Sequence, residues 1–172
     1  ESSVRRGCPD GATGAAGAEI VLRHGEGGGG HYERSGIGLR LGPLWSTEWG
    51  RWSAQLRPEL ELSHFRYTGP APAAPDGLTQ GGAIAHVRAV RRGSDRLRPY
   101  AEAGLGLSLF SNDRLGEKAF STHFQFSQHL GLGVRFAKGG FAGYQYSHYS
   151  NGDIDLPNSG IDLHQLVVGV DF

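Results

Sequence analysis

Polar and apolar residues alternate along much of the chain with a period of two. The alternation is clearest from Arg51 to His64, where apolar side chains take every second position and polar or charged ones lie between them. It recurs from His123 to Phe136, around Arg34 to Leu41 and from Ala101 to Phe110. Because successive side chains of a β-strand point to opposite faces, this period predicts strands and not helices.

The strands predicted in this way number about eight, with ends defined to within about two to four residues. They lie near residues 17–24, 32–42, 51–66, 80–91, 97–110, 121–136, 140–150 and 161–172. Most are longer than the ~5–6 residues usual in soluble proteins and approach the ~9–11 residues of a tilted membrane strand. An even number of strands can close into a barrel, which leaves no unpaired edge in hydrocarbon.

The fold class predicted from these strands is all-β, an eight-stranded antiparallel up-and-down transmembrane β-barrel. No composition shift divides the chain, so we expect a single outer-membrane β-barrel domain over residues 1–172. Residues 1–16 are expected to form a poorly ordered or periplasmic N-terminal segment. No run approaches the ~20 apolar residues of a transmembrane helix.

The polar faces of these strands are expected to fill the barrel interior, where charged side chains pair with one another. The residues placed there are Arg34, Arg40, Arg57, Glu59, Glu61, Arg88, Glu102 and Arg135. A soluble barrel with the faces reversed, apolar inward around a ligand, is the alternative. The exposed aromatic Phe172 at the end of the last strand favours the membrane barrel, because it resembles the C-terminal signal of bacterial outer-membrane barrels.

The links between strands predict how the barrel is oriented, since such barrels keep short turns in the periplasm and longer loops outside. Short links lie at Arg92 to Arg96 and Ala137 to Gly139. Longer links lie at Gly25 to His31, Thr68 to Thr79, Ser111 to Phe120 and Asn151 to Gly160. The last of these is therefore expected at the cell surface, near the outer leaflet.

Composition changes this picture little. The chain has 17 Lys and Arg and 17 Asp and Glu, so no net charge favours nucleic-acid binding. The single Cys8 can form no internal disulfide, and the absence of Met fits a chain whose signal peptide has been removed. Gly27 to Gly30 is expected to be a flexible loop and not a phosphate-binding motif.

The remaining histidines indicate no metal site. His86, His123 and His129 fall on polar faces and are expected to be hydrogen-bonded core residues, because no paired ligand spacing accompanies them. No cofactor and no metal are predicted.

Three side chains near the last long loop could carry chemistry. His148 and Ser150 project from the same face of one strand. A hairpin through the Asn151 to Gly160 loop, with its register near the midpoint, would set His148 opposite Asp162. A serine, a histidine and a carboxylate suit acyl transfer. Spacing alone leaves a second interpretation open, in which these are ordinary polar residues at the headgroup level.

The segment His148-Tyr149-Ser150-Asn151, together with Pro157-Asn158-Ser159-Gly160-Ile161-Asp162 and the terminal aromatic strand, resembles the catalytic signature of the lipid A 3-O-deacylases (PagL type). The resemblance implies an outer-membrane serine-type ester hydrolase of a Gram-negative bacterium that removes the acyl chain at the 3-position of lipid A. It implies a nucleophile at Ser150, a base at His148 and an acid at Asp162.

The chain departs from the family pattern at one position, because Asp162 stands where the family has Glu, one methylene longer. Asp155 or Asp153 is the alternative acid. Asn151 and Asn158 also match family positions, and we expect them to hold the oxyanion or to shape the loop.

The expected partners are lipid A of lipopolysaccharide as substrate and outer-membrane lipid, and the resemblance also allows a homodimer. Arg66 or Arg114 at the outer rim could attract the lipid A phosphates. The alternative function is a non-catalytic outer-membrane barrel with a structural or adhesive role. A soluble carrier resembling lipocalins is a third hypothesis.

Overall fold

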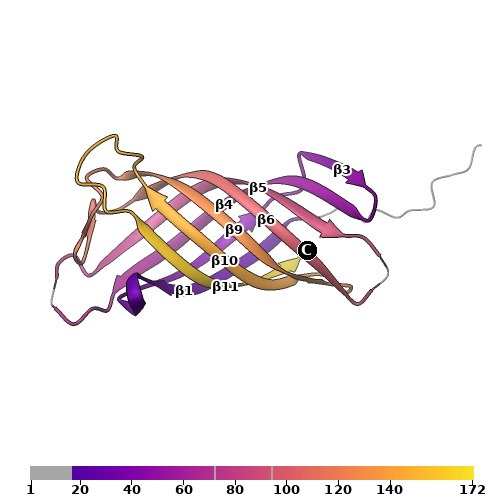
Figure 1. Cartoon of the computed structure of the whole chain (residues 1–172), viewed down its shortest axis with the longest axis horizontal. Helices are drawn as coiled ribbons and strands as arrows, with labels where there is room; N and C mark the ends of the chain where they lie inside the picture. Colours follow the sequence, from indigo (N-terminus) through magenta and orange to yellow (C-terminus); the bar gives the residue numbers. More distant parts are fainter. Residues whose placement is uncertain (1–16, 72, 94) are drawn as a thin grey trace, which may run out of the picture.

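The computed structural model describes residues 17–71, 73–93 and 95–172, and it shows a closed antiparallel barrel of eight strands (Figure 1). The barrel strands are β1 (Glu19–Gly27), β2 (Tyr32–Arg40), β4 (Trp52–Tyr67), β5 (Gly77–Arg91), β6 (Leu97–Phe110), β9 (Phe124–Phe136), β10 (Phe141–Ser150) and β11 (Ile161–Asp171). Each pairs with its neighbour along the barrel, and β1 pairs with β11 to close it. The predicted fold class and the eight strands are confirmed.

Three short strands, β3, β7 and β8, and the 3-10 turn η1 were not predicted. Strand β3 (Trp45–Trp49) continues along β4 beyond the end of β2, and the turn that follows includes Gly50 with a φ of 52°. Strands β7 (Arg114–Leu115) and β8 (Lys118–Ala119) form a small hairpin in the loop between β6 and β9. The glycine run expected as a flexible loop is the end of β1 followed by a 3-10 turn, η1 (Gly28–Gly30).

The outer wall of the barrel is apolar and its interior is charged. Leu60, Leu105 and Leu166 are examples of large apolar side chains that stay exposed, with 57%, 69% and 73% of their surface accessible. This arrangement suits a barrel surrounded by hydrocarbon, and it excludes the soluble barrel with its apolar faces inward. No helix among the described residues is long and apolar enough to cross a membrane.

The interior charges form one connected network. Glu59 accepts from Arg23 at 2.5 Å and from Arg40 at 2.8 Å, and Glu102 pairs with Arg40 and Arg88 at 2.7 Å each. All eight side chains predicted to pair inside do so, and Glu19 and Arg23 join them. Burying a charge costs free energy unless the charge is paired. Because these side chains pair with one another, they can fill the interior of a narrow barrel in place of water.

The buried histidines belong to this interior. His86 lies between Glu59 and Glu102, with its ring nitrogens 3.3 Å from each carboxylate, and His129 Nδ1 lies 2.8 Å from Ser147 Oγ. His123 is exposed, and its Nδ1 lies 2.7 Å from the carbonyl oxygen of Phe110. His86 and His129 are therefore core residues as predicted, whereas the prediction was wrong for His123, because its side chain lies outside the core. Cys8 and the predicted segment 1–16 lie outside the described residues.

The interior changes from charged to aromatic at the end that carries the long loops. Phe65, Phe110 and Tyr149 pack there, with the Phe65 and Tyr149 rings 5.6 Å apart in a T-shaped arrangement. Tyr149 is fully buried, so it fixes which face of β10 points inward. The side chains on either side of Tyr149 must point to the outer wall.

Candidate active site

His148 and Ser150 lie on the outer face of β10, on either side of the inward-facing Tyr149. Tyr144 and Tyr146 share that outer face, while Gln145 and Ser147 are buried inside. The predicted strand geometry therefore places a histidine and a serine next to each other on the wall of the barrel and near its loop end. Both side chains are half-buried, so a molecule in the surrounding lipid can reach them.

Asp162 lies directly opposite His148 in the β10–β11 ladder, the register predicted from the hairpin. The His148 Nδ1 and Asp162 Oδ1 atoms are 2.7 Å apart. The carboxylate can therefore hold the imidazole in the tautomer that carries its proton on Nδ1 and leaves Nε2 free as a base.

Tyr146 makes a second contact with the same carboxylate oxygen, and the sequence did not reveal it. Its hydroxyl donates to Asp162 Oδ1 at 2.5 Å. Tyr146 is two residues from His148 on the same face, so the strand period alone could have suggested it. The partner could not be inferred from spacing, because it depends on how far each side chain reaches along the ladder.

The third member of the group, Ser150, is near His148 but not bonded to it. The hydrogen bonds of the described residues include none between Ser150 Oγ and the His148 ring. Gly160, with a φ of 54°, lies beside the imidazole, where an added Cβ would be 3.2 Å from His148 Cε1 and 3.8 Å from Nε2. Nucleophile–base contacts are often long before substrate binds.

Asn151 and Asn158 fasten the loop between β10 and β11. Asn151 is fully buried, and its amide nitrogen donates to the carbonyl oxygens of Phe120 and Asp155, both at 2.8 Å. The Asn151 backbone N–H donates to Asn158 Oδ1 at 3.2 Å, and Asn158 Nδ2 donates to Asp153 Oδ1 at 2.9 Å. The two side-chain amides are thus engaged within the protein.

The alternative acids lie in this loop and bond elsewhere. Asp153 accepts from Asn158, and Asp155 Oδ1 accepts from the backbone N–H of Leu156 at 2.9 Å. Within the part of the chain that the structure describes, Asp162 is the carboxylate that bonds to His148.

A second serine and histidine meet on the outer wall, on β1 and β2. The His24 Nδ1 and Ser35 Oγ atoms are 2.9 Å apart, and both side chains are exposed. No carboxylate among the described residues bonds to His24, so this pair lacks the third member found beside Ser150.

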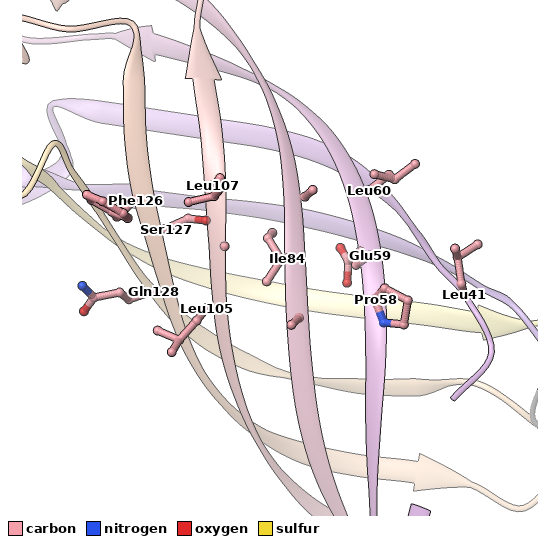
Figure 2. Close-up of a pocket in the computed structure, with 13 residues that line it drawn as sticks. Leu41, Pro58, Glu59, Leu60, Ile84, Leu105, Leu107, Phe126, Ser127 and Gln128 are labelled. Atoms are coloured by element: carbon pink, nitrogen blue, oxygen red, sulfur yellow. The ribbon is translucent and has the colours of Figure 1, made fainter. Parts of the chain in front are cut away.

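An apolar groove runs along the wall away from Tyr146. One part, of about 460 Å³, is lined by Tyr146, Leu130 and the small side chain of Ala103. The other part, of about 630 Å³, extends across β9, β6, β5 and β4 (Figure 2). Its lining includes Leu41, Pro58, Leu60, Ala83, Ala85, Leu105, Leu107, Phe126 and Gln128. The volumes and the apolar lining suit a hydrocarbon chain.

The described residues hold no group of three or more His, Cys, Asp or Glu side chains arranged to bind a metal ion. Arg66 and Arg114, the predicted rim cations, are exposed at the loop end of the barrel. Lys118 of the β7–β8 hairpin lies nearby, with its Nζ 5.6 Å from the centre of the Tyr32 ring.

Comparison with known proteins gives consistent matches over most of the chain. The family model described as lipid A 3-O-deacylase (PagL) matches residues 33–171. The lipid A deacylase PagL of Bordetella bronchiseptica is 34% identical over 148 residues, which cover 84% of this chain and 79% of the relative. The Pseudomonas aeruginosa protein of the same name is 30% identical over 137 residues, covering 77% of each chain.

A solved structure has the same fold. The crystal structure of the outer membrane enzyme PagL superimposes with a TM-score of 0.79 at 21% sequence identity, covering 90% of this chain and 99% of the other. At this level of identity the match establishes the fold.

Proposed function

The chain belongs to the lipid A 3-O-deacylase (PagL) family, and from this premise we propose that Ser150, His148 and Asp162 hydrolyse the ester-linked acyl chain at the 3-position of lipid A. Family membership makes the chain an outer-membrane β-barrel of the ester-hydrolase class. The residues that carry the reaction are our assignment.

The observation that carries the assignment is the His148–Asp162 contact on the outer wall, next to Ser150. Placing a charged pair against lipid costs free energy, so a pair in this position is expected to serve a function. A non-catalytic structural or adhesive barrel would be favoured if these side chains faced the interior or lay far apart. They face outward, and the histidine and carboxylate are in contact.

In the proposed mechanism Ser150 Oγ attacks the ester carbonyl while His148 Nε2 takes the hydroxyl proton. The bond between the carbonyl carbon and the sugar oxygen then breaks, and the imidazolium returns the proton to that oxygen. Water, deprotonated by the same histidine, attacks the acyl-serine, the bond between the carbonyl carbon and Ser150 Oγ breaks, and the imidazolium returns the proton to Oγ as the fatty acid is released. Asp162 stabilises the imidazolium in both steps.

We assign Tyr146 as a positioning residue for Asp162. The tyrosine hydroxyl and His148 Nδ1 converge on one carboxylate oxygen, at 2.5 and 2.7 Å. Two donors on one oxygen limit rotation of a short side chain that is otherwise exposed. Tyr146 would therefore keep the carboxylate directed at the imidazole.

We assign Asn151 and Asn158 to shaping the loop. The amide nitrogen of Asn151 is engaged by two carbonyl oxygens and that of Asn158 by Asp153, which supports this role over that of oxyanion donors. The loop so fixed sets the position of Gly160 beside the imidazole.

The substrate is expected to lie in the membrane with its acyl chain along the apolar groove. Tyr146 lines this groove and contacts Asp162, so one side chain borders both the groove and the site. All three reacting side chains come from β10 and β11 of one chain, so the proposed chemistry is complete in a single copy. A homodimer stays a prediction.

Product analysis tests this function. Purified protein in detergent is incubated with lipid A that carries ester-linked chains at both the 3- and 3′-positions, and the products are resolved by tandem mass spectrometry. We expect loss of one 3-hydroxyacyl chain from the 3-position, with the amide-linked chains retained. Loss from the 3′-position, or intact lipid A after prolonged incubation, would contradict the proposal.

A further inference from the structure

The three tryptophans of the chain all lie on one hairpin, at the end of the barrel opposite Ser150. Trp45 and Trp49 begin and end β3, and Trp52 begins β4. Figure 1 shows β3 at the end far from the β10–β11 loop. The orientation predicted from loop length places this end at the periplasmic leaflet.

The tryptophans share the lipid-facing side of the sheet. Along β4 the outward positions include Leu60 and Leu62, and Trp52 falls on the same alternation. Trp49 is paired with Trp52, and directly paired residues of two strands lie on the same face. Trp45 and Trp49 are 51% and 50% exposed, so the hairpin extends the apolar wall toward the periplasm with unpacked aromatic rings.

Arginines flank the same tryptophans. Arg91 is paired with Trp52 and shares its outward face, and Arg51 occupies the turn before Trp52. The backbone N–H of Arg92 donates to the carbonyl oxygen of Arg51 at 2.6 Å, which brings the two turns together. We define the Trp–Arg rim as Trp45, Trp49, Trp52, Arg51 and Arg91.

The two arginines of this rim form no ion pair with the described carboxylates of the neighbouring turns. Glu48 on β3 pairs with Arg92, and Asp95 lies in the next turn. Among the described residues, Arg51 and Arg91 form no ion pair. Other cations gather at this end, since Arg96 and Lys138 lie in the two neighbouring turns and are exposed.

We propose that the Trp–Arg rim binds the phosphate groups of anionic phospholipids in the periplasmic leaflet. Tryptophan prefers the level of the headgroups, where its ring is half in hydrocarbon and its N–H reaches water. An arginine on the lipid-facing wall is costly unless its guanidinium extends to a charged headgroup. A net anionic lipid, and not merely a zwitterionic one, matches cations that have no carboxylate partner.

Tryptophan fluorescence reports on this rim alone, because the chain has no other tryptophan. The whole chain is reconstituted in phosphatidylcholine nanodiscs that contain a minor fraction of either brominated phosphatidylglycerol or brominated phosphatidylcholine, with bromine at the same acyl carbons. We expect stronger quenching by the brominated phosphatidylglycerol. One contact between an arginine and a lipid phosphate should enrich the anionic lipid roughly five-fold beside the tryptophans. High salt should reduce this enrichment.

Matched variants locate the effect. Arg51→Gln/Arg91→Gln should remove the difference between the two lipids, whereas Arg66→Gln/Arg114→Gln, at the other end of the barrel, should keep it. All four side chains are exposed, and circular dichroism in the nanodisc checks the barrel. Equal quenching by the two lipids in the unaltered protein, absence of quenching by either, or equal loss in both variants would overturn the proposal. Acyl release plays no part in this readout.

Discussion

At the scale of single residues, the proposed site depends on how the carboxylate of Asp162 is held. Its Oδ1 atom receives both the Tyr146 hydroxyl and His148 Nδ1, and its side chain is otherwise 57% exposed. A short carboxylate on a lipid-facing wall has few other groups to fix it. The hydroxyl of Tyr146 is therefore expected to matter for turnover more than for substrate binding.

Replacing Tyr146 with Phe removes this donor and keeps the ring. We expect kcat for acyl release to fall about ten-fold, the effect of one hydrogen bond to a charged group, with KM little changed. Tyr144→Phe is the matched control, because its hydroxyl lies on the same face but contacts His164 at 2.5 Å. Equal losses in the two variants, or a loss confined to KM, would refute a positioning role.

At the scale of elements, the loop between β10 and β11 positions the site. Asn151 holds it to the loop before β9 through Phe120, and Asn151 is also bonded to Asp155 in the middle of the same loop. These contacts join two segments that meet only at the end of the folded barrel. The loop should therefore open locally, without unfolding of the strands, when the amide is removed.

The Asn151→Ala variant tests this. Loss of the buried amide leaves two carbonyl oxygens without their donor, at a cost of about 1–3 kcal/mol. We expect faster hydrogen exchange in residues 151–160 and unchanged exchange in β10. Asn112→Ala, which removes one bond to the Gly77 carbonyl in another loop, should leave residues 151–160 unaffected. Unchanged exchange in the Asn151 variant would show that the loop is held by other contacts.

Local pattern was enough to predict the strands and part of the site. Alternation identified the eight barrel strands, and loop length identified the pairing of His148 with Asp162. The continuation of β2 by β3 was not foreseen, because Pro43 and Gly42 interrupt the alternation there. The Tyr146 contact and the partners of Asn151 were also missed, since they depend on side-chain reach and on loops distant in sequence.

At the scale of the whole molecule, the interior network ties the strands together. Glu59 is fully buried and contacts Arg23 and Arg40 from two neighbouring strands, as well as His86. The barrel has no apolar core at this level, so its stability depends on complete pairing of these charges. The outer wall is available to contact the surrounding lipid and the proposed substrate.

Glu59→Gln should therefore destabilise the barrel strongly. Two buried guanidinium groups lose their shared counter-charge, and we expect about 3–5 kcal/mol less unfolding free energy. Glu48→Gln breaks the exposed pair with Arg92 and should cost less than about 1 kcal/mol. Urea unfolding in lipid vesicles compares the two, and similar midpoints would contradict a structural role for the network.

The most direct test of the proposed function compares acyl release from lipid A by the unaltered protein, by Ser150→Ala and by Ser35→Ala. Ser35 is the matched control, because it also lies on the outer wall, and the histidine that it contacts, His24, has no carboxylate partner among the described residues. We expect mass spectrometry to show loss of the 3-linked chain with the unaltered protein and with Ser35→Ala, and none with Ser150→Ala. Continued release by Ser150→Ala would contradict the proposed function.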